Sequence, residues 1–515
     1  MSEFKKTPGV YIEERSVFGN SVVPVATAIP AFVGYTAKAE SDGKSLKNKL
    51  VKITSLVDFV TLFGNNYSGK FSISALEDQT KDEFDLLLKG QKYEVKPAEG
   101  NKMFYLFNCI RLFYANGGAD AYVVSVGSYN DDIDKDALIA GVELLKKEDE
   151  ITMILTPDAL NLKGDPGEDG TFTYAPYFDV VNNAMEQCLE LKSRVTLIDF
   201  PDATIQPSPI TPWENEIEKF QEGIGKNPET TSYGISYYPW LETVVAPESE
   251  VSFSSIDAAT DLKTIIVTSS STKEVIENTL NDLVSNRDAE SPDLKKYSAD
   301  EKKLQVLSRD YKQVLSEIRK KVNLLPPCAA MAGVYTKVDD QRGVWKAPAN
   351  LGLNSVIKPH VKIDDKLQEN LNVPINGKAI NIIRSFQGRG SAWVWGARTL
   401  DGNSNDWRYI NVRRLFLFLE QSIKSATFPF VFEPNDANTW NTLSSMISNF
   451  LTSVWKAGGL VGPTPESAFQ VLVGLGVTMT FQDILEGYLR VTVKVAPSRP
   501  AEFIVITFEQ KMQEA

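Results

Sequence analysis

The 515-residue chain contains a single histidine, His360, so any mechanism that needs an imidazole base depends on this residue. It follows Pro359 in a predicted loop. A Ser-His-Asp triad also needs a serine on a sharp turn, but the sequence has no Gly-x-Ser-x-Gly motif. We therefore interpret His360 as an ordinary surface or packing residue and predict no catalytic residue. A serine-hydrolase-type α/β enzyme remains the alternative to the structural function that the motifs below indicate.

Cysteine is scarce as well. The three cysteines, Cys109, Cys188 and Cys328, lie far apart and show no Cys-x-x-Cys spacing, so we predict buried thiols rather than a zinc or redox site. Residues 388–391 (GRGS) lack the lysine of a phosphate-binding loop. Residues 165–170 (DPGEDG) resemble the start of a calcium loop but carry glycine where a ligand is needed. No metal or cofactor site is predicted.

Long hydrophobic runs are missing too. No stretch approaches the roughly 20 apolar residues of a membrane helix, and residues 1–6 (MSEFKK) do not resemble a signal peptide. We expect a chain that is made in the cytoplasm and does not insert into a membrane. The formal net charge of −13 opposes binding to nucleic acid.

Positive charge is concentrated in one stretch of this acidic chain. Residues 341–400 hold nine Lys or Arg against three Asp or Glu, a local net charge of +6. Such a stretch can form a basic face that binds an acidic partner, or it can consist of scattered solvated side chains. The sequence alone supports both interpretations.

What the chain does contain is an alternation of strands and helices. Apolar runs at 151–155, 194–199 and 232–238 predict buried strands, with helices at 177–192 and near 214–220 between them. This order predicts a parallel sheet covered by helices. Further segments extend the pattern: strands at 24–36 and 121–126, and helices at 131–150, 411–425 and 439–455.

The region after residue 243 changes character. Residues 244–298 are rich in Ser, Thr, Asp and Glu, which indicates a surface elaboration, with a possible strand at 264–268. Ser298 and Glu301 match a capping box, so we predict one long helix from Ser298 to about residue 322.

Strand-forming segments lie near both ends of the chain, at residues 7–14 (TPGVYIEE), 490–495 and 503–508. We expect each to lack a local hairpin partner. An unpartnered strand can add to a sheet edge of another subunit, because main-chain pairing demands little of the sequence. The ends of the chain therefore predict assembly.

Several motifs, taken in order, resemble the tail sheath proteins of contractile phage tails and related contractile injection systems, of the phage-like, extracellular type built from a single chain. They cover the first ~35 residues and most of the chain after residue 324, and an ordered set is more specific than any one motif. The motifs are TPGVY (7–11), AIPAFVG (28–34), GVY (333–335), RGVWKAPAN (342–350), WGARTL (395–400), NVRRLF (411–416), FEPND (432–436) and APSRPAEF (496–503).

The resemblance implies a mixed α/β, multi-domain sheath protein with a subtilisin-like central domain but no protease activity. We expect a strand-donating arm at 1–20, an N-terminal part of the core at 21–130 and the central α/β domain at 131–399, elaborated at about 244–297. A C-terminal α+β domain at 400–515 would face the tube and end in a second arm at 502–510, with residues 489–495 as one acceptor strand.

The resemblance also implies a function and partners. The subunit would form hexameric rings around an inner tube and contract to drive that tube through a target membrane, together with baseplate and cap proteins and with any sheath paralogues. It would assemble in the bacterial cytoplasm and could leave the cell with the particle. We predict inter-subunit strands at Val10, Tyr11, Ile12, Phe503, Ile504, Val505, Ile506, Thr507 and Phe508, and tube attachment through Arg413, Arg414, Lys424 and Lys456.

Overall fold

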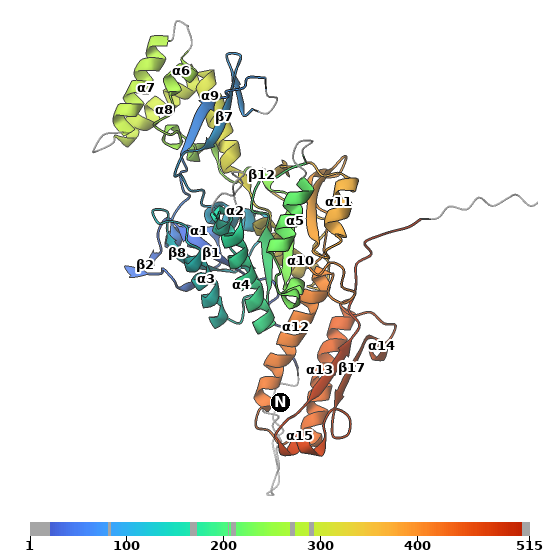
Figure 1. The fold of residues 1–515 in the computed structure, drawn as a ribbon. Helices are drawn as coiled ribbons and strands as arrows, with labels where there is room; N and C mark the ends of the chain where they lie inside the picture. The colour runs from blue at the N-terminus through green and yellow to red at the C-terminus, as the bar shows by residue number, and fades with distance from the viewer. Residues whose placement is uncertain are drawn as a thin grey trace, which may run out of the picture. The chain divides into compact units, whose positions relative to one another are not determined.

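A computed structural model describes residues 21–80, 84–164, 173–203, 205–207, 213–267, 273–287 and 293–506. The chain divides into two units (Figure 1). The central unit comprises Ala26–Arg414 and the segment that begins at Arg499; the C-terminal unit comprises Leu415–Ser498 with the residues up to Val25. In the described part of the chain no helix has the length and apolar character needed to cross a bilayer.

An eight-stranded sheet forms the core of the central unit. Its order is β16-β15-β11-β10-β9-β1-β8-β4, in which the strands from β15 to β8 run parallel and the two edge strands run antiparallel to their neighbours. The strands are β1 (Pro30–Thr36), β4 (Leu50–Ile53), β8 (Ala121–Ser128), β9 (Met153–Leu155), β10 (Val195–Asp199), β11 (Gly234–Tyr238), β15 (Ile380–Phe386) and β16 (Gly390–Val394). β1, β9, β10 and β11 are buried throughout, as expected of strands covered on both faces.

Two glycines show how helices cover both faces of this sheet. A Cβ atom on Gly141 of α3 (Lys135–Leu144) would meet the side chain of Val33, whereas a Cβ atom on Gly34 would meet Leu106 of α2 (Leu106–Ala115). Successive residues of a strand point to opposite faces, so α3 and α2 lie on opposite sides of β1. α4 (Ala175–Leu191) packs beside α3, and α10 (Cys328–Arg342) packs beside α2.

The predicted parallel sheet is therefore confirmed, with α5 (Trp213–Gly223) and α4 near their predicted positions. β1, β8 and β4, which precede residue 130, belong to the same sheet as the later strands. Smaller elements complete this unit: α1 (Leu56–Phe63), the β2–β3 ribbon (Glu40–Ser41, Lys44–Ser45), the sheet of β12 (Leu241–Thr243), β13 (Leu324–Leu325) and β14 (Val356–Pro359), and α11 (Asp365–Asn372).

A second hydrophobic cluster joins two distant stretches of the sequence. Apolar residues of β5 (Phe71–Ala75), β6 (Leu86–Leu88) and β7 (Gln91–Pro97) are buried against helices that follow residue 250. The helices are α6 (Leu262–Ile266), α7 (Lys273–Arg287), α8 (Leu294–Leu307) and α9 (Arg309–Val322). The elaboration thus has its own core and extends beyond the predicted 244–297 region.

Two predictions within this cluster are wrong. The proposed strand at 264–268 is the helix α6 as far as Ile266, and Thr268 lies outside the described residues. The proposed single helix from Ser298 is two helices that meet at Ser308. The hydroxyl of Ser308 accepts a hydrogen bond from the Tyr311 backbone N–H at 3.2 Å and so caps α9, while Asp293 caps α8.

The C-terminal unit contains a helical pair and a β-hairpin. α12 (Ile410–Thr427) begins in the central unit and continues into this one, and α13 (Ala437–Lys456) follows it. β17 (Phe469–Val473) packs on α13 and pairs antiparallel with β18 (Val491–Val495), from Phe469 opposite Val495 to Val473 opposite Val491. The short helix α14 (Pro465–Ala468) precedes β17, and α15 (Phe481–Leu485) lies in the connection between β17 and β18. The predicted strand at 490–495 is therefore present, but the expectation that it lacks a partner in its own chain is wrong, because it pairs with β17.

Candidate assembly site at the C-terminal segment

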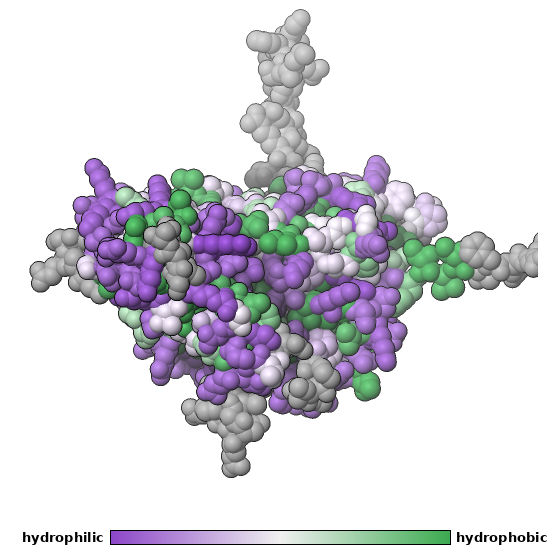
Figure 2. Space-filling view, turned by 90° about the horizontal axis from the view of Figure 1, so that it is seen from above, coloured by the Kyte–Doolittle hydropathy of each residue, from purple (hydrophilic) through white to green (hydrophobic). Residues whose placement is uncertain are grey.

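The segment after β18 returns to the central unit at Arg499. Its residues 503–506 (FIVI) belong to no strand in the described part of the chain, and their side chains are 71–87% exposed. Figure 2 shows an apolar stretch at the right-hand edge of a largely hydrophilic surface. Such a run of exposed strand formers is typical of a surface that another chain covers.

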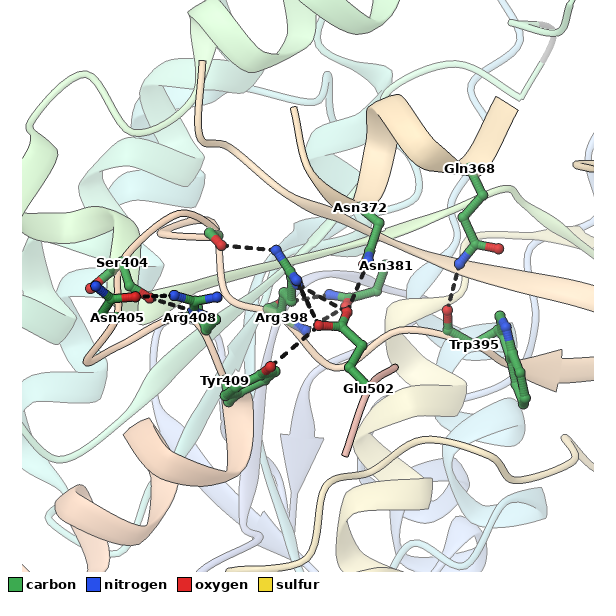
Figure 3. A network of polar contacts seen from close by, with 11 residues as sticks. Gln368, Asn372, Asn381, Trp395, Arg398, Ser404, Asn405, Arg408, Tyr409 and Glu502 are labelled. Carbon is green, nitrogen blue, oxygen red and sulfur yellow. Dashed lines mark hydrogen bonds and ion pairs between the residues drawn. The ribbon is translucent and has the colours of Figure 1, made fainter. Parts of the chain in front are cut away.

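Glu502, directly before this apolar run, is held by three side chains that we name the Glu502 clasp: Arg398, Tyr409 and Asn372 (Figure 3). Arg398 donates from Nε at 3.0 Å to Oε1 and from Nη2 at 2.6 Å to Oε2. Asn372 Nδ2 donates to Oε1 at 2.8 Å, and the Tyr409 hydroxyl donates to Oε2 at 3.3 Å. Arg398 Nε also donates to Oε2 at 3.2 Å, so Oε1 has two donor atoms and Oε2 has three.

The clasp is largely shielded from water, since the Arg398 side chain is 4% exposed and that of Glu502 20%. Burial alone would raise the pKa of Glu502, but the hydrogen bonds from Arg398, Asn372 and Tyr409 outweigh it and hold the pKa below its usual value. The carboxylate is therefore ionised at neutral pH, and the pair is a charge-assisted, bidentate one.

Arg398 is itself rigidly placed by the sheet. Asn381 of β15 accepts a hydrogen bond from the Arg398 backbone N–H at 2.7 Å and donates to its carbonyl, also at 2.7 Å. Arg398 Nη1 donates to the carbonyl of Gly402 at 3.0 Å. The guanidinium that receives Glu502 is therefore oriented before the C-terminal segment binds.

A groove of about 970 Å³ borders the clasp. Its walls come from α11, from the loop around Ala347, from the strand end at Trp395 and from residues 500–504. On the rim, Arg384 Nη1 lies 2.6 Å from Oδ1 of Asp365, whose side chain is 93% exposed. The start of the C-terminal segment thus forms one wall of a groove in the central unit.

The predicted strand residues fall partly within the described chain. Phe503, Ile504, Val505 and Ile506 are described and exposed. Val10, Tyr11, Ile12, Thr507 and Phe508 lie outside the described residues, as do the arm at 1–20 and the end of the arm at 502–510. The clasp could not be predicted from the sequence, because Arg398 and Glu502 are 104 residues apart and no local spacing relates them.

The four predicted tube-attachment residues separate into two pairs. Arg413 and Arg414 are 6% and 4% exposed, so they are not surface cations in this structure. Arg414 is paired with Asp339 of α10 at 2.6 Å, and Arg413 donates to the Ser232 hydroxyl at 2.5 Å while its guanidinium lies 3.7 Å from the Trp407 ring centroid. Lys424 and Lys456, in the last turns of α12 and α13, are exposed.

The predicted basic stretch at 341–400 is also partly internal. Arg398 and Arg384 are 3% and 9% exposed and are engaged in the two ion pairs described above. Lys378 donates to the carbonyls of Gln221 and Ile224, both at 2.6 Å. At least these three cations therefore stabilise the central unit rather than form a basic face.

The residues relevant to the enzyme hypothesis do not form a nucleophile–base pair. His360 Nδ1 lies 3.1 Å from Oε1 of Glu242, a carboxylate rather than a hydroxyl or thiol. Asp199, at the end of β10, accepts a hydrogen bond from the Cys328 backbone N–H at 2.8 Å where α10 begins. Burial raises the pKa of Asp199 to about 7 and raises that of the Cys328 thiol well above its usual value. A thiol of this kind is protonated and inert, and all three cysteines are buried, as predicted.

Comparisons with known proteins agree with the sheath interpretation. Residues 403–511 match the phage tail sheath C-terminal domain. The tail sheath protein of Vibrio phage KVP40 is 26% identical over 155 residues, which are 30% of this chain and 23% of the phage protein. The chain thus matches about a quarter of that curated relative.

Solved structures resemble the chain over almost its whole length. The PVC sheath complex of an extracellular contractile injection system, in the contracted state, is 27% identical, with a TM-score of 0.57 and 99% of each chain covered. The contracted helical sheath of the anti-feeding prophage is also 27% identical, with a TM-score of 0.58, covering 99% of this chain and 100% of that one. A chain of the anti-feeding prophage baseplate is 28% identical, with a TM-score of 0.57 and the same coverage.

These relatives are structural sheath and baseplate components, and they support a sheath function rather than the serine-hydrolase alternative. The agreement extends from the C-terminal domain to the full-length fold. Residues 403–511 therefore resemble the C-terminal domain of phage tail sheaths, and the whole chain resembles the sheath proteins of contractile injection systems.

Proposed function

We propose that this chain is a structural sheath subunit that polymerises as hexameric rings around an inner tube. The sheath contracts from a metastable extended state and drives the tube through a target membrane. The observation that carries the proposal is the apolar segment 503–506, exposed and anchored at Glu502, on a chain whose fold matches contracted sheaths along its length.

The subunits are linked by donated strands. Residues 503–506 add to the hairpin of a neighbouring subunit, because β17 and β18 form a two-stranded sheet whose outer edges have no strand partner in the described chain. A two-stranded sheet is only marginally stable alone, so a third strand stabilises the acceptor as well as the link. The N-terminal residues Val10, Tyr11 and Ile12 act in the same way, with the arm at 1–20.

The partners follow from this arrangement: an inner tube protein, baseplate and cap proteins, and other sheath paralogues where the particle has them. Lys424 and Lys456 contact the tube. The subunit assembles in the bacterial cytoplasm and leaves the cell only as part of the particle, without binding nucleic acid or inserting into a membrane. Work comes from the free-energy difference between two packings of the same subunits, which is small for each subunit and multiplied over many copies.

A matched pair of variants tests strand donation. Ile504→Pro removes a backbone N–H and a ladder hydrogen bond, whereas Ile504→Val keeps both. Ile504 is 79% exposed and in no strand, so neither change should alter the fold of the isolated chain. Each variant is expressed with its own operon and alone, and is viewed by negative-stain electron microscopy.

We expect striated or hollow tubes from the natural chain and from Ile504→Val, and only small particles from Ile504→Pro. Deleting residues 1–20 should likewise leave a folded chain that forms no sheath. Small particles from the natural chain in both samples would refute the sheath proposal. Normal sheaths from Ile504→Pro would refute donation of this strand while leaving the sheath function intact.

A further inference from the structure

The C-terminal segment changes its attachment within a few residues. Just after β18, the backbone is still bound to the C-terminal unit, because Val461 N donates to the carbonyl of Ala496 at 2.8 Å and Ser498 N donates to that of Gly459 at 3.1 Å. Four residues after Ser498, Glu502 is held by Arg398, Asn372 and Tyr409 of the central unit. The donated segment therefore starts from the central unit, whereas the acceptor hairpin belongs to the C-terminal unit.

The apolar run itself does not specify how it pairs. Side chains of a strand alternate between its two faces, so Phe503 and Val505 share one face and Ile504 and Ile506 share the other. Both faces are apolar, so a strand shifted by one residue would present equally apolar side chains on each face. Strands without a polar and an apolar face are weakly specified in register and prone to slip.

The clasp fixes the position of the segment along the strand axis, which the apolar sequence of residues 503–506 does not specify. A side chain held by five hydrogen bonds cannot move along the strand axis by one residue, a distance of about 3.3 Å, without breaking them. With Glu502 turned toward Arg398, Ile504 and Ile506 take the same face as Glu502 when the segment pairs as a strand. The bidentate geometry makes this placement directional as well as strong.

We propose that the Glu502 clasp sets the register of the donated strand and ties it to the central unit. This proposal rests on the proposed strand donation. Glu502 is a positioning residue that acts through the segment after it. Each link of the sheath then runs from the central unit of one subunit, through the Arg398–Glu502 pair, to the C-terminal hairpin of the next subunit. Force on the strand during contraction passes into the sheet through Arg398, which Asn381 holds on β15.

Disulfide scanning of assembled sheath tests the register directly. The three natural cysteines are buried, so Val505→Cys is combined with one cysteine at a time at 470, 471, 472, 492, 493 or 494 of the hairpin. Directly opposed strand residues have Cβ atoms about 4.5–5.5 Å apart and diagonal ones about 7–8 Å, and a disulfide requires about 3.8 Å. Ladders of linked subunits on non-reducing gels therefore report the register.

With Glu502 present, we expect one position on the acceptor strand to give most of the product. In Glu502→Ala, the yield at that position should fall about two- to threefold and appear at its neighbours, because adjacent registers become similarly populated. Asp365→Asn, which breaks the neighbouring Asp365–Arg384 pair without touching the segment, should match the natural chain. If Glu502→Ala does not fold, the double variant Asn372→Ala with Tyr409→Phe removes two donors and carries the same test.

The same dominant position in Glu502→Ala would overturn the register role and leave strand donation standing. An absence of inter-subunit disulfides from every pair in the natural background would refute strand donation, and the register role with it. A shift of register in Asp365→Asn as large as that in Glu502→Ala would also overturn the proposal, since it would trace the effect to the groove rather than to the clasp.

Discussion

The buried pair between Arg414 and Asp339 predicts a large loss of stability when one partner is removed. Arg414 Nη1 and Nη2 donate to the two carboxylate oxygens of Asp339 at 2.9 and 2.6 Å, and the two side chains are 3% and 4% exposed. In Asp339→Ala, the partners that Arg414 keeps among the described residues are the carbonyl of Thr27 at 2.8 Å and the Tyr335 ring, whose centroid is 4.6 Å away. A buried cation then lacks its counter-charge.

The magnitude follows from the degree of burial. Breaking a buried ion pair by removing one partner costs about 3–5 kcal/mol. The central unit has roughly 400 residues, and an unfolding entropy of about 2.1 cal/mol/K per residue gives about 0.8 kcal/mol/K for it. The midpoint of its thermal unfolding should therefore fall by about 4–6 °C.

The assay is thermal and urea unfolding of the unassembled chain, applied to the variants of a double-mutant cycle. Asp339→Leu combined with Arg414→Met removes both charges and should cost less than Asp339→Ala alone. The neighbouring Asp340 is exposed, and Asp340→Ala should stay within about 0.5 kcal/mol of the natural chain. A shift below about 1 °C for Asp339→Ala, or a double variant as unstable as the sum of its parts, would refute the reasoning.

Two further predictions concern the buried carboxyl group of Asp199 and the exposed lysines Lys424 and Lys456. Asp199 has its pKa raised from 3.8 to about 7 by burial, so its stabilising contribution is complete below pH 3.8 and is lost as the pH rises through 7. Relative to Asp199→Asn, the natural chain should lose up to about 1.4 kcal/mol of unfolding free energy per pH unit between pH 5 and 7 in urea titrations, and parallel pH profiles would contradict this. Lys424→Glu and Lys456→Glu should each weaken attachment to an acidic tube by about 1–2 kcal/mol per subunit at low salt, measured by co-sedimentation of sheath and tube. The exposed Lys44→Glu serves as the control, and unchanged co-sedimentation of both variants would exclude these lysines from the tube contact.

The three buried arginines near the start of α12 have different roles. Arg398, Arg413 and Arg414 are all nearly buried, and Arg398 holds Glu502, which directly precedes an exposed segment. Arg413 and Arg414 pin the first turns of α12 to the central unit, just before the chain passes into the C-terminal unit. Their substitution should therefore affect the stability of the central unit rather than attachment to the tube.

The amino-acid sequence alone determined the local and periodic features. The apolar runs that became β9, β10 and β11, and the helices between them, were predictable because burial on both faces of a parallel sheet demands uninterrupted apolar strands. The ordered motifs also identified the sheath resemblance, which the comparisons confirm. The apolar character of residues 503–506 could likewise be read directly, since it depends on no other part of the chain.

Only the tertiary structure decided which residues meet. Arg414 and Asp339 are 75 residues apart and Arg398 and Glu502 are 104 apart, so whether each arginine faces water or a carboxylate depends on how the elements pack. The partner of β18 lies 18 residues or more before it, across a loop and a short helix, so no tight two-residue turn marks the pairing in the sequence. Charge and hydrophobicity are properties of single residues, whereas burial and pairing belong to contacts that the chain makes only after it folds.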